Sequence, residues 1–230
     1  MTATAQARPG DNSGDITPEE RRGALRAAAM EHFAFDGWTM DSVYRGARDL
    51  GLDPALADLA FPEGLWDVVD FCLSETDRVM TEELTARGVD TMKVREKITT
   101  AVLVRLEHAQ KQREAMRRLV GLLSQPVHAS RMSRYTWRAA DAMWRAAGDT
   151  STDYNWYTKR TILSGVYAST VLVWMGDDTP DLDETRAFLA RRIENVMQFE
   201  KTKAKVLSLG ENRPSLTRFL GRLRYPGARA

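Results

Sequence analysis

The chain has 230 residues, of which 43% are hydrophobic, enough for the core of one generous helical domain or of two small ones. Its 33 Lys and Arg residues nearly balance 32 Asp and Glu residues, so the overall charge does not indicate a nucleic-acid or membrane partner. No apolar run approaches the roughly 18 residues that span a bilayer, which argues against a membrane-crossing chain. Residues 1–16 lack the apolar core of a secretory signal, and we expect a disordered tail of a cytoplasmic bacterial protein.

The N-terminal part of the chain shows the signals of four helices. Thr17, Pro18 and Glu20 form a capping box with proline at the first helical position, and Gly37 ends the helix that they begin. Thr39 is typical of the N-cap of the next helix. These signals predict helices over 17–35, 39–50, 53–60 and 65–84. Their lengths and tight turns indicate a helix-turn-helix-like module over residues 17–85.

The rest of the chain continues with helical periodicity. After residue 90, apolar residues recur every three or four positions, at Val94, Ile98, Val102, Leu106 and Ala109. Further helical patterns cover 112–125, 128–147, 153–175 and 180–206, and no strand-like alternation interrupts them. The sequence therefore predicts an all-α fold, a bundle of about nine helices whose second domain covers residues 86–206.

No combination of residues predicts catalysis or a metal site. Cys72 is the single cysteine and lies among apolar residues, as a buried structural thiol would. His32, His108 and His128 are scattered along the chain, without the spacing of metal ligands. We therefore expect no cofactor and no enzymatic activity of the chain itself.

Residues 148–160, with the sequence GDTSTDYNWYTKR, place aromatic side chains where a new helix begins. Helical geometry brings Trp156, Tyr157 and Arg160 near one another on its first turns. Trp, Tyr and Arg dominate the hot spots of protein contacts, so this segment is a candidate interaction surface. The alternative is that Trp156 and Tyr157 are buried against Trp144, at the end of the preceding helix.

The helix after this segment mixes large apolar residues with small ones such as Ser164 and Gly165. Small residues beside large ones leave room for an apolar ligand. Close packing in a core or against a partner helix is the alternative. The candidate ligand-lining residues are Ile162, Leu163, Val166, Val171 and Trp174.

The C-terminal segment 211–225 combines an apolar stripe with arginines beside it. This pattern predicts a short basic amphipathic helix that lies in a membrane interface. A terminal helix packed on its own domain is the alternative. The candidate membrane-contact residues are Leu216, Arg218, Phe219, Leu220, Arg222 and Leu223.

The segment GDTSTDYNWYTKR resembles the signature of the ubiquinone (coenzyme Q) biosynthesis accessory protein nine family, a lipid-binding family with a TetR-like fold. Three more segments follow the family's order, namely HFAFDGWTMDSVYRGARDLGL at 32–52, FPEG at 61–64 and DDTPDLDETRAFLARRIENVM at 177–197. The resemblance covers most of residues 17–206. It implies a TetR-like helical bundle that forms a homodimer through its last two long helices.

The resemblance also implies a task. Family members take ubiquinone precursors with isoprenoid tails from the inner membrane, to which they attach peripherally, and present the head group to a di-iron hydroxylase. The helix after the signature would line the lipid channel. Matched residue by residue, the surface for the hydroxylase comprises Asp153, Asn155, Trp156, Tyr157 and Arg160, flanked by Met143 and Trp144.

A TetR-type transcriptional regulator with an apolar ligand is the alternative function. A recognition helix needs Lys, Arg or small polar donors for bases and phosphates. The third predicted helix, 53–60, carries none of the cations, and the span 49–77 contains eight acidic residues without one Lys, Arg or His. Because counterion release from DNA needs positive charge, we expect no nucleic-acid partner.

Overall fold

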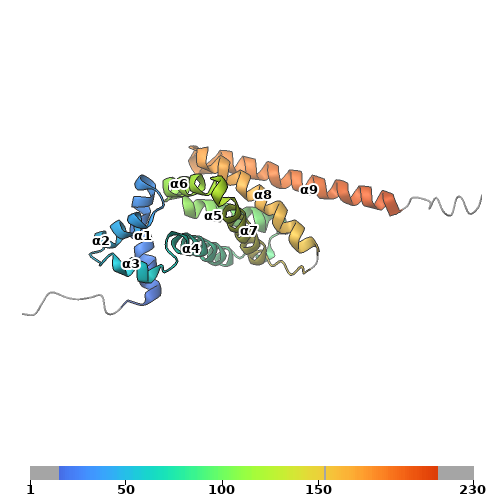
Figure 1. The fold of residues 1–230 in the computed structure, drawn as a ribbon. Helices are drawn as coiled ribbons and strands as arrows, with labels where there is room; N and C mark the ends of the chain where they lie inside the picture. Colours follow the sequence, from blue (N-terminus) through green and yellow to red (C-terminus); the bar gives the residue numbers. More distant parts are fainter. Residues whose placement is uncertain (1–15, 153, 212–230) are drawn as a thin grey trace, which may run out of the picture.

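The computed structural model describes residues 16–152 and 154–211, and within them every regular element is a helix (Figure 1). The all-α prediction is confirmed. The helices of the N-terminal part are α1 (Pro18–Asp36), α2 (Met40–Asp49), α3 (Ala55–Ala60) and α4 (Leu65–Ala86). Those of the remaining part are α5 (Val94–Gln110), α6 (Arg113–Leu123), α7 (Ala129–Ala146), α8 (Tyr154–Gly176) and α9 (Asp183–Glu211), with short 3-10 turns η2 (Val89–Thr91), η3 (Pro126–His128) and η4 (Pro180–Leu182).

Local capping explains where the first helices begin. The Thr17 hydroxyl accepts a hydrogen bond from the Glu20 backbone N–H at 3.2 Å, while the Glu20 carboxylate accepts one from the Thr17 N–H at 2.8 Å. This is the predicted capping box. Thr39 caps α2 by accepting from the Ser42 N–H. The predicted helices over 17–35, 39–50, 53–60 and 65–84 therefore agree with α1 to α4 within a few residues.

Helices α1 and α2 cross at a glycine. A Cβ atom on Gly46 would lie 2.8 Å from the backbone nitrogen of Ala29, which no side chain tolerates. The crossing therefore requires glycine at this position, and it brings the two helices into the most intimate contact of the N-terminal module.

Two hydrogen bonds fasten this module to α6, far along the chain. Trp38, stacked on Phe33 with ring centroids 4.1 Å apart, donates its indole N–H to the Ala115 carbonyl at 2.7 Å. Arg118 donates to the Ala34 carbonyl at 2.5 Å. The core around α1 to α4 also includes residues of α6 and α7. The division into 17–85 and 86–206 stays a prediction, because this core draws on both ranges.

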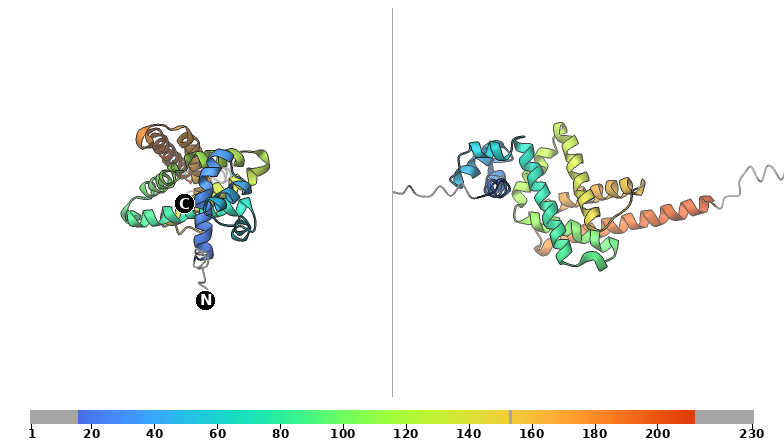
Figure 2. Two further views of the ribbon diagram at one scale, coloured as in Figure 1. Left: turned by 90° about the vertical axis from the view of Figure 1, so that its left-hand side faces the viewer. Right: turned by 90° about the horizontal axis from the view of Figure 1, so that it is seen from below.

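The last two helices are joined by a tightly bonded turn. Arg113 and Arg117 both donate to the Met175 carbonyl at the end of α8, at 2.9 and 2.5 Å. The buried Asp177 carboxylate accepts hydrogen bonds from Thr179 and Thr185, which fixes the start of α9. From there α9 passes α8, and its C-terminal half extends beyond the other helices (Figures 1 and 2).

Several predictions lie outside the described residues, namely the tail 1–16 apart from Ile16, residue Asp153, and the amphipathic segment 211–225 apart from Glu211 at the end of α9. All candidate membrane-contact residues, from Leu216 to Leu223, belong to that group. Among the helices that are described, none combines the length and the apolar character needed to cross a bilayer.

Candidate functional site

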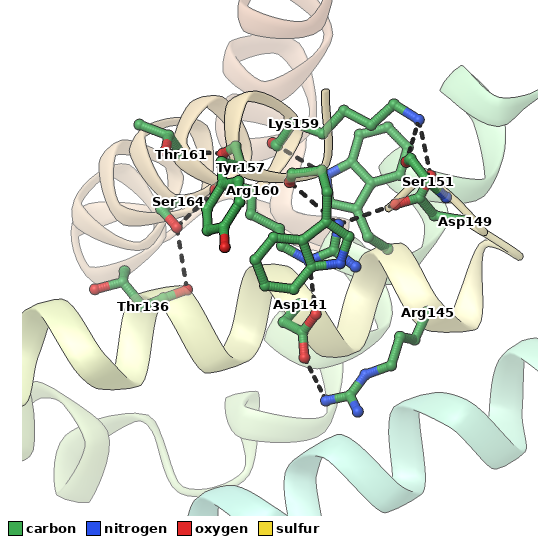
Figure 3. Close-up of polar contacts among 12 residues, drawn as sticks. Thr136, Asp141, Arg145, Asp149, Ser151, Tyr157, Lys159, Arg160, Thr161 and Ser164 are labelled. Atoms are coloured by element: carbon green, nitrogen blue, oxygen red, sulfur yellow. Dashed lines mark hydrogen bonds and ion pairs between the residues drawn. The ribbon is translucent and has the colours of Figure 1, made fainter. Parts of the chain in front are cut away.

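Arg160 lies at the centre of a buried ion-pair network on α8 (Figure 3). Its guanidinium donates to Asp141 at 2.6 Å, to Asp149 at 2.9 Å and to the Trp156 carbonyl at 3.2 Å, and it stacks 4.1 Å from the centre of the Trp156 ring. Only 1% of the residue is exposed. Arg160 therefore has no surface to offer a partner, and it instead supports the ring of Trp156 from beneath.

Asp149 ties the turn before α8 to the helix itself. Its carboxylate accepts from Lys159 at 2.8 Å and from the Ser151 hydroxyl at 2.5 Å, in addition to Arg160. Burial acts to raise the pKa of Asp149, but these hydrogen bonds outweigh it and hold the pKa well below its usual value. The carboxylate stays ionised and keeps Lys159 and Arg160 in place.

Trp156 and Tyr157 form an aromatic surface together with Trp137 of α7. The Trp156 ring meets Trp137 edge to face with centroids 5.7 Å apart, and Tyr157 at 4.7 Å. Trp156 is half-buried, whereas Tyr157 is 59% exposed. Trp137 was not among the predicted residues, although its position seven residues before Trp144, on the same face of a helix, is a signal that could have found it.

Trp144 and Met143, which were predicted to flank the partner surface, lie at the pocket and in the core instead. Trp144 does not cover Trp156; its indole N–H donates to the Lys159 carbonyl at 3.1 Å, and its ring faces a pocket on the other side of α8. Met143 is fully buried in the core. The alternative was burial of Trp156 and Tyr157 against Trp144; in the structure Tyr157 is exposed, and the α7 ring that meets Trp156 is that of Trp137.

The pocket has a volume of about 640 Å³ and lies between the start of α5, the first half of α8 and the middle of α9. Three of the five predicted ligand-lining residues line it: Ile162, Leu163 and Val166. Val171 and Trp174 lie outside it, and Trp174 is buried with its indole N–H donating to Gln110 at 2.7 Å. The other lining residues are Lys93, Val94, Arg95, Ile98, Trp144, Asn155, Thr158, Lys159, Ile193, Val196 and Met197.

A second hollow of about 470 Å³ continues the pocket along α8 and α9. The two share Ile162, Val166 and Val196, so they adjoin, and together we call them the groove. Gly165 faces this second hollow, and a Cβ atom there would find no other atom within 4 Å. The small residues of α8 thus leave open space at this position instead of admitting a neighbouring helix of the same chain.

The acidic span 49–77 is neutralised more than its sequence suggests. Asp67 pairs with Arg22 at 2.7 Å, and Asp70 pairs with Arg138 at 3.1 Å. Asp77 pairs with the buried Arg105. These arginines belong to α1, α5 and α7, so a count of charged residues within 49–77 does not include them. The face that repels phosphate is thus smaller than predicted, although α3 itself presents no cation and exposes Leu59.

Nothing in residues 16–152 and 154–211 groups three His, Cys, Asp or Glu side chains around a possible metal ion. Cys72 is buried in the N-terminal core, as predicted, and burial raises the pKa of its thiol to about 12. Such a thiol is protonated at neutral pH.

The fold is that of the TetR-type regulators. The solved structure of the TetR transcriptional regulator from Nitrosomonas europaea ATCC 19718 has a TM-score of 0.63 at 21% identity and covers 76% of this chain and 97% of its own. A putative TetR-family regulator from Rhodococcus sp. has a TM-score of 0.54 at 17% identity, over 77% and 99%. These likenesses show the fold alone.

The sequence assigns the chain to a family within this fold. The COQ9 family model matches residues 129–200, which include α7, α8 and the first part of α9 and thus the aromatic surface and two of the three helices beside the groove. The ubiquinone biosynthesis protein COQ9 of Rattus norvegicus is 33% identical over 88% of the chain and 67% of its own length. The human protein is 32% identical (88% and 66%), and COQ9-B of Xenopus laevis 30% (88% and 71%).

The chain therefore belongs to the COQ9 family, as the signature segment predicted. It spans about two thirds of the length of these relatives, all three of which are named mitochondrial ubiquinone biosynthesis proteins.

Proposed function

We propose that this protein is an accessory protein of ubiquinone biosynthesis, which binds an isoprenoid-tailed quinone precursor and presents its head group to a di-iron hydroxylase. The names of its relatives support a role in that pathway. The groove between α5, α8 and α9 is the observation that carries the proposal. It is largely apolar, and its main pocket has a volume typical of small-molecule sites.

The groove suits a long chain better than a compact effector. The second hollow extends the pocket along α8, past Gly165 and Ser169, so a ligand can run along the helix. Apolar side chains such as Ile162 and Val196 line the shared part and would shield an isoprenoid tail from water. Polar residues lie at both ends, with Asn155 and Lys159 in the main pocket and Ser169, Arg192 and Asn195 in the second hollow.

Presentation to a partner follows from the periodicity of α8. Asn155, Lys159 and Ile162 line the pocket, while Trp156 and Tyr157 on the same turns belong to the aromatic surface. A head group held near Asn155 would therefore lie next to the surface that we assign to the hydroxylase. Asp153 belongs to this proposed surface by its position in the sequence, and Met143 and Arg160 support it from inside.

The homodimer and the membrane contact complete the proposal. The helices α8 and α9 expose Leu172 and Phe199, apolar side chains that a second copy would cover. We assign the segment 211–225 to a reversible contact with the inner membrane, from which the lipid would enter. We propose no nucleic-acid partner, because α3 carries no Lys or Arg, and we assign the hydroxylation to the partner enzyme and not to this chain.

A transcriptional regulator with an apolar ligand is the second candidate, and the TetR-like fold is the observation that favours it. Extraction of lipids from the purified protein, followed by mass spectrometry, separates the two. The proposal expects an isoprenoid quinone precursor in stoichiometric amount. A small polar effector, together with binding to one DNA sequence in a selection from random duplexes, would favour the regulator.

A further inference from the structure

The groove has a charged rim of one sign. Lys93, Arg95 and Lys159 line the main pocket, and no Asp or Glu is among its lining residues. Lys93 and Arg95 stand at the start of α5, and Lys159 faces them from the second turn of α8. Three cations beside an apolar cavity are not needed to hold an isoprenoid tail, whereas they suit an anionic head group at the end of such a tail.

The three cations differ in how fully they are paired. Lys159 is bound to Asp149 at 2.8 Å and to Ser151 at 2.9 Å. Arg95 has a loose pair with Glu194 of α9, 3.7 Å between nitrogen and oxygen, with both side chains about half exposed. Among the side chains that the structure describes, none forms an ion pair with Lys93, although the Glu96 carboxylate accepts a hydrogen bond from the Lys93 backbone N–H at 3.2 Å. The rim thus carries positive charge that the protein itself leaves partly uncompensated.

We propose that this cationic rim, formed by Lys93, Arg95 and Lys159, selects ligands whose apolar chain ends in an anionic head, a phosphate or a carboxylate. This inference rests on the proposed function, since it assumes that the groove holds the apolar chain. Lys93 and Arg95 contact the head, and Arg95 leaves Glu194 for it. Lys159 stays on Asp149 and adds its charge to the field at the rim.

Binding of an anionic head exchanges a weak ion pair of the rim for stronger contacts with the ligand. A loose, half-exposed pair such as Arg95 with Glu194 contributes little, about 0–1 kcal/mol, so replacing it with a ligand oxygen is inexpensive. Hydrogen bonds between a cation and an anionic oxygen are about twice as strong as neutral ones. The apolar wall beside the rim also reduces screening by water, which strengthens attraction to an anion.

A chain-matched pair of probes tests the inference on the full-length protein. Binding of geranylgeranyl phosphate and of geranylgeraniol is measured by titration calorimetry below their aggregation limits. We expect the phosphate to bind about tenfold more tightly or better, the scale of one charge-assisted hydrogen bond. In the double variant Lys93→Gln, Arg95→Gln, the two probes should bind within about threefold of each other, through a loss of affinity for the phosphate. High salt should shrink the preference in the wild type.

Matched variants keep the outcomes apart. Lys111→Gln, at the opposite end of α5, should retain the preference, whereas Ile162→Trp, which fills the shared part of the groove, should weaken both probes. Equal binding of the two probes to the wild type, or a preference that survives the double variant, would overturn the inference while leaving the proposed function intact. Inorganic phosphate that competes as well as the lipid phosphate would show a site for the free anion instead, and overturn it too. If neither probe binds the wild type, the proposed function fails together with the inference.

Discussion

The N-terminal module and the α8–α9 edge of the molecule are packed in opposite ways. In the module, α1 and α2 cross so closely that Gly46 has room for no side chain, and hydrogen bonds of Trp38 and Arg118 join the module to α6. At the α8–α9 edge, Gly165 faces open space and the groove runs between the helices. The chain thus has the fold of a TetR-type regulator, with a closely packed crossing in its N-terminal module and a groove between helices at the α8–α9 edge.

This difference shows where binding can occur. A helix-turn-helix module that contacts DNA needs cations on its recognition helix, and α3 exposes Leu59 instead. The groove, in contrast, combines an apolar wall with polar residues at both ends, one of which lies next to an aromatic surface. The scaffold alone therefore does not decide the function, because side chains at its two ends differ in character.

The largest effect is expected from removing Arg160, which fixes the aromatic surface to the core. Arg160→Ala leaves the carboxylates of Asp141 and Asp149 buried without their partner and should lower the free energy of unfolding by about 3–5 kcal/mol, measured by urea unfolding. The matched control is Arg145→Ala, which removes a second, largely exposed partner of Asp141 and should change stability by no more than about 1 kcal/mol. If the Arg160→Ala protein is stable and loses only its binding to the hydroxylase, Arg160 belongs to the interaction surface after all.

The next effect concerns Tyr157, the exposed member of the aromatic surface. Tyr157→Ala should weaken binding of the hydroxylase by about 2 kcal/mol, the size of an aromatic hot spot, with little change in thermal stability. Phe35→Ala serves as the control, because Phe35 is 81% exposed on the N-terminal module and should not affect that binding. Surface plasmon resonance with immobilised hydroxylase measures both. Equal losses in the two variants would place the partner elsewhere.

Two glycines compare the packing of the two regions directly. Gly46→Ala pushes a Cβ atom against the backbone of α1 and should destabilise the protein by about 1–3 kcal/mol. Gly165→Ala meets no atom and improves helix propensity, so it should stabilise by about 0.5–1 kcal/mol. Urea unfolding of both variants checks the contrast. A destabilised Gly165→Ala monomer would show that the α8–α9 edge is as tightly packed as the module.

A smaller effect is expected of acid. Burial acts to raise the pKa of Asp177, but hydrogen bonds from Thr179 and Thr185 hold it well below the ordinary value of 3.8. The unfolded carboxyl takes up a proton first, so its contribution to stability is complete above about pH 4 and is lost as the pH falls further. Asp177→Asn should therefore show a shallower loss of stability in acid than the wild type. Asp178→Asn, at a 90% exposed side chain, should follow the wild type, and a common slope for all three proteins would contradict the assignment.

The helices could be predicted from sequence because their signals are local. Thr17, Gly37 and Thr39 lie within one turn of the helix ends that they determine. The apolar residues Ile162, Leu163 and Val166 were also predicted as ligand-lining, since their helix is rich in small and large apolar residues. The family could be predicted because the segment 148–160 resembles the family's signature residue by residue.

The finer arrangement of the site could not be predicted, because it depends on distant segments. The carboxylates that bury Arg160 lie 11 and 19 residues away, on a turn and on α7. The pocket exists only because α5 and α9, which lie far before and after one another in the sequence, both pack beside α8. Likewise, the arginines that neutralise Asp70 and Asp77 are separated from them by as many as 68 residues.

Photo-crosslinking tests the central claim, that the groove between α5, α8 and α9 holds the lipid. A geranylgeranyl-type probe with a photoreactive diazirine in its tail is bound to the full chain and irradiated, and labelled peptides are mapped by mass spectrometry. The account predicts labels within 93–98, 155–166 and 193–199, none in α1 to α3, and their loss in Ile162→Trp. Labels on the N-terminal module, or a pattern that Ile162→Trp leaves unchanged, would contradict it.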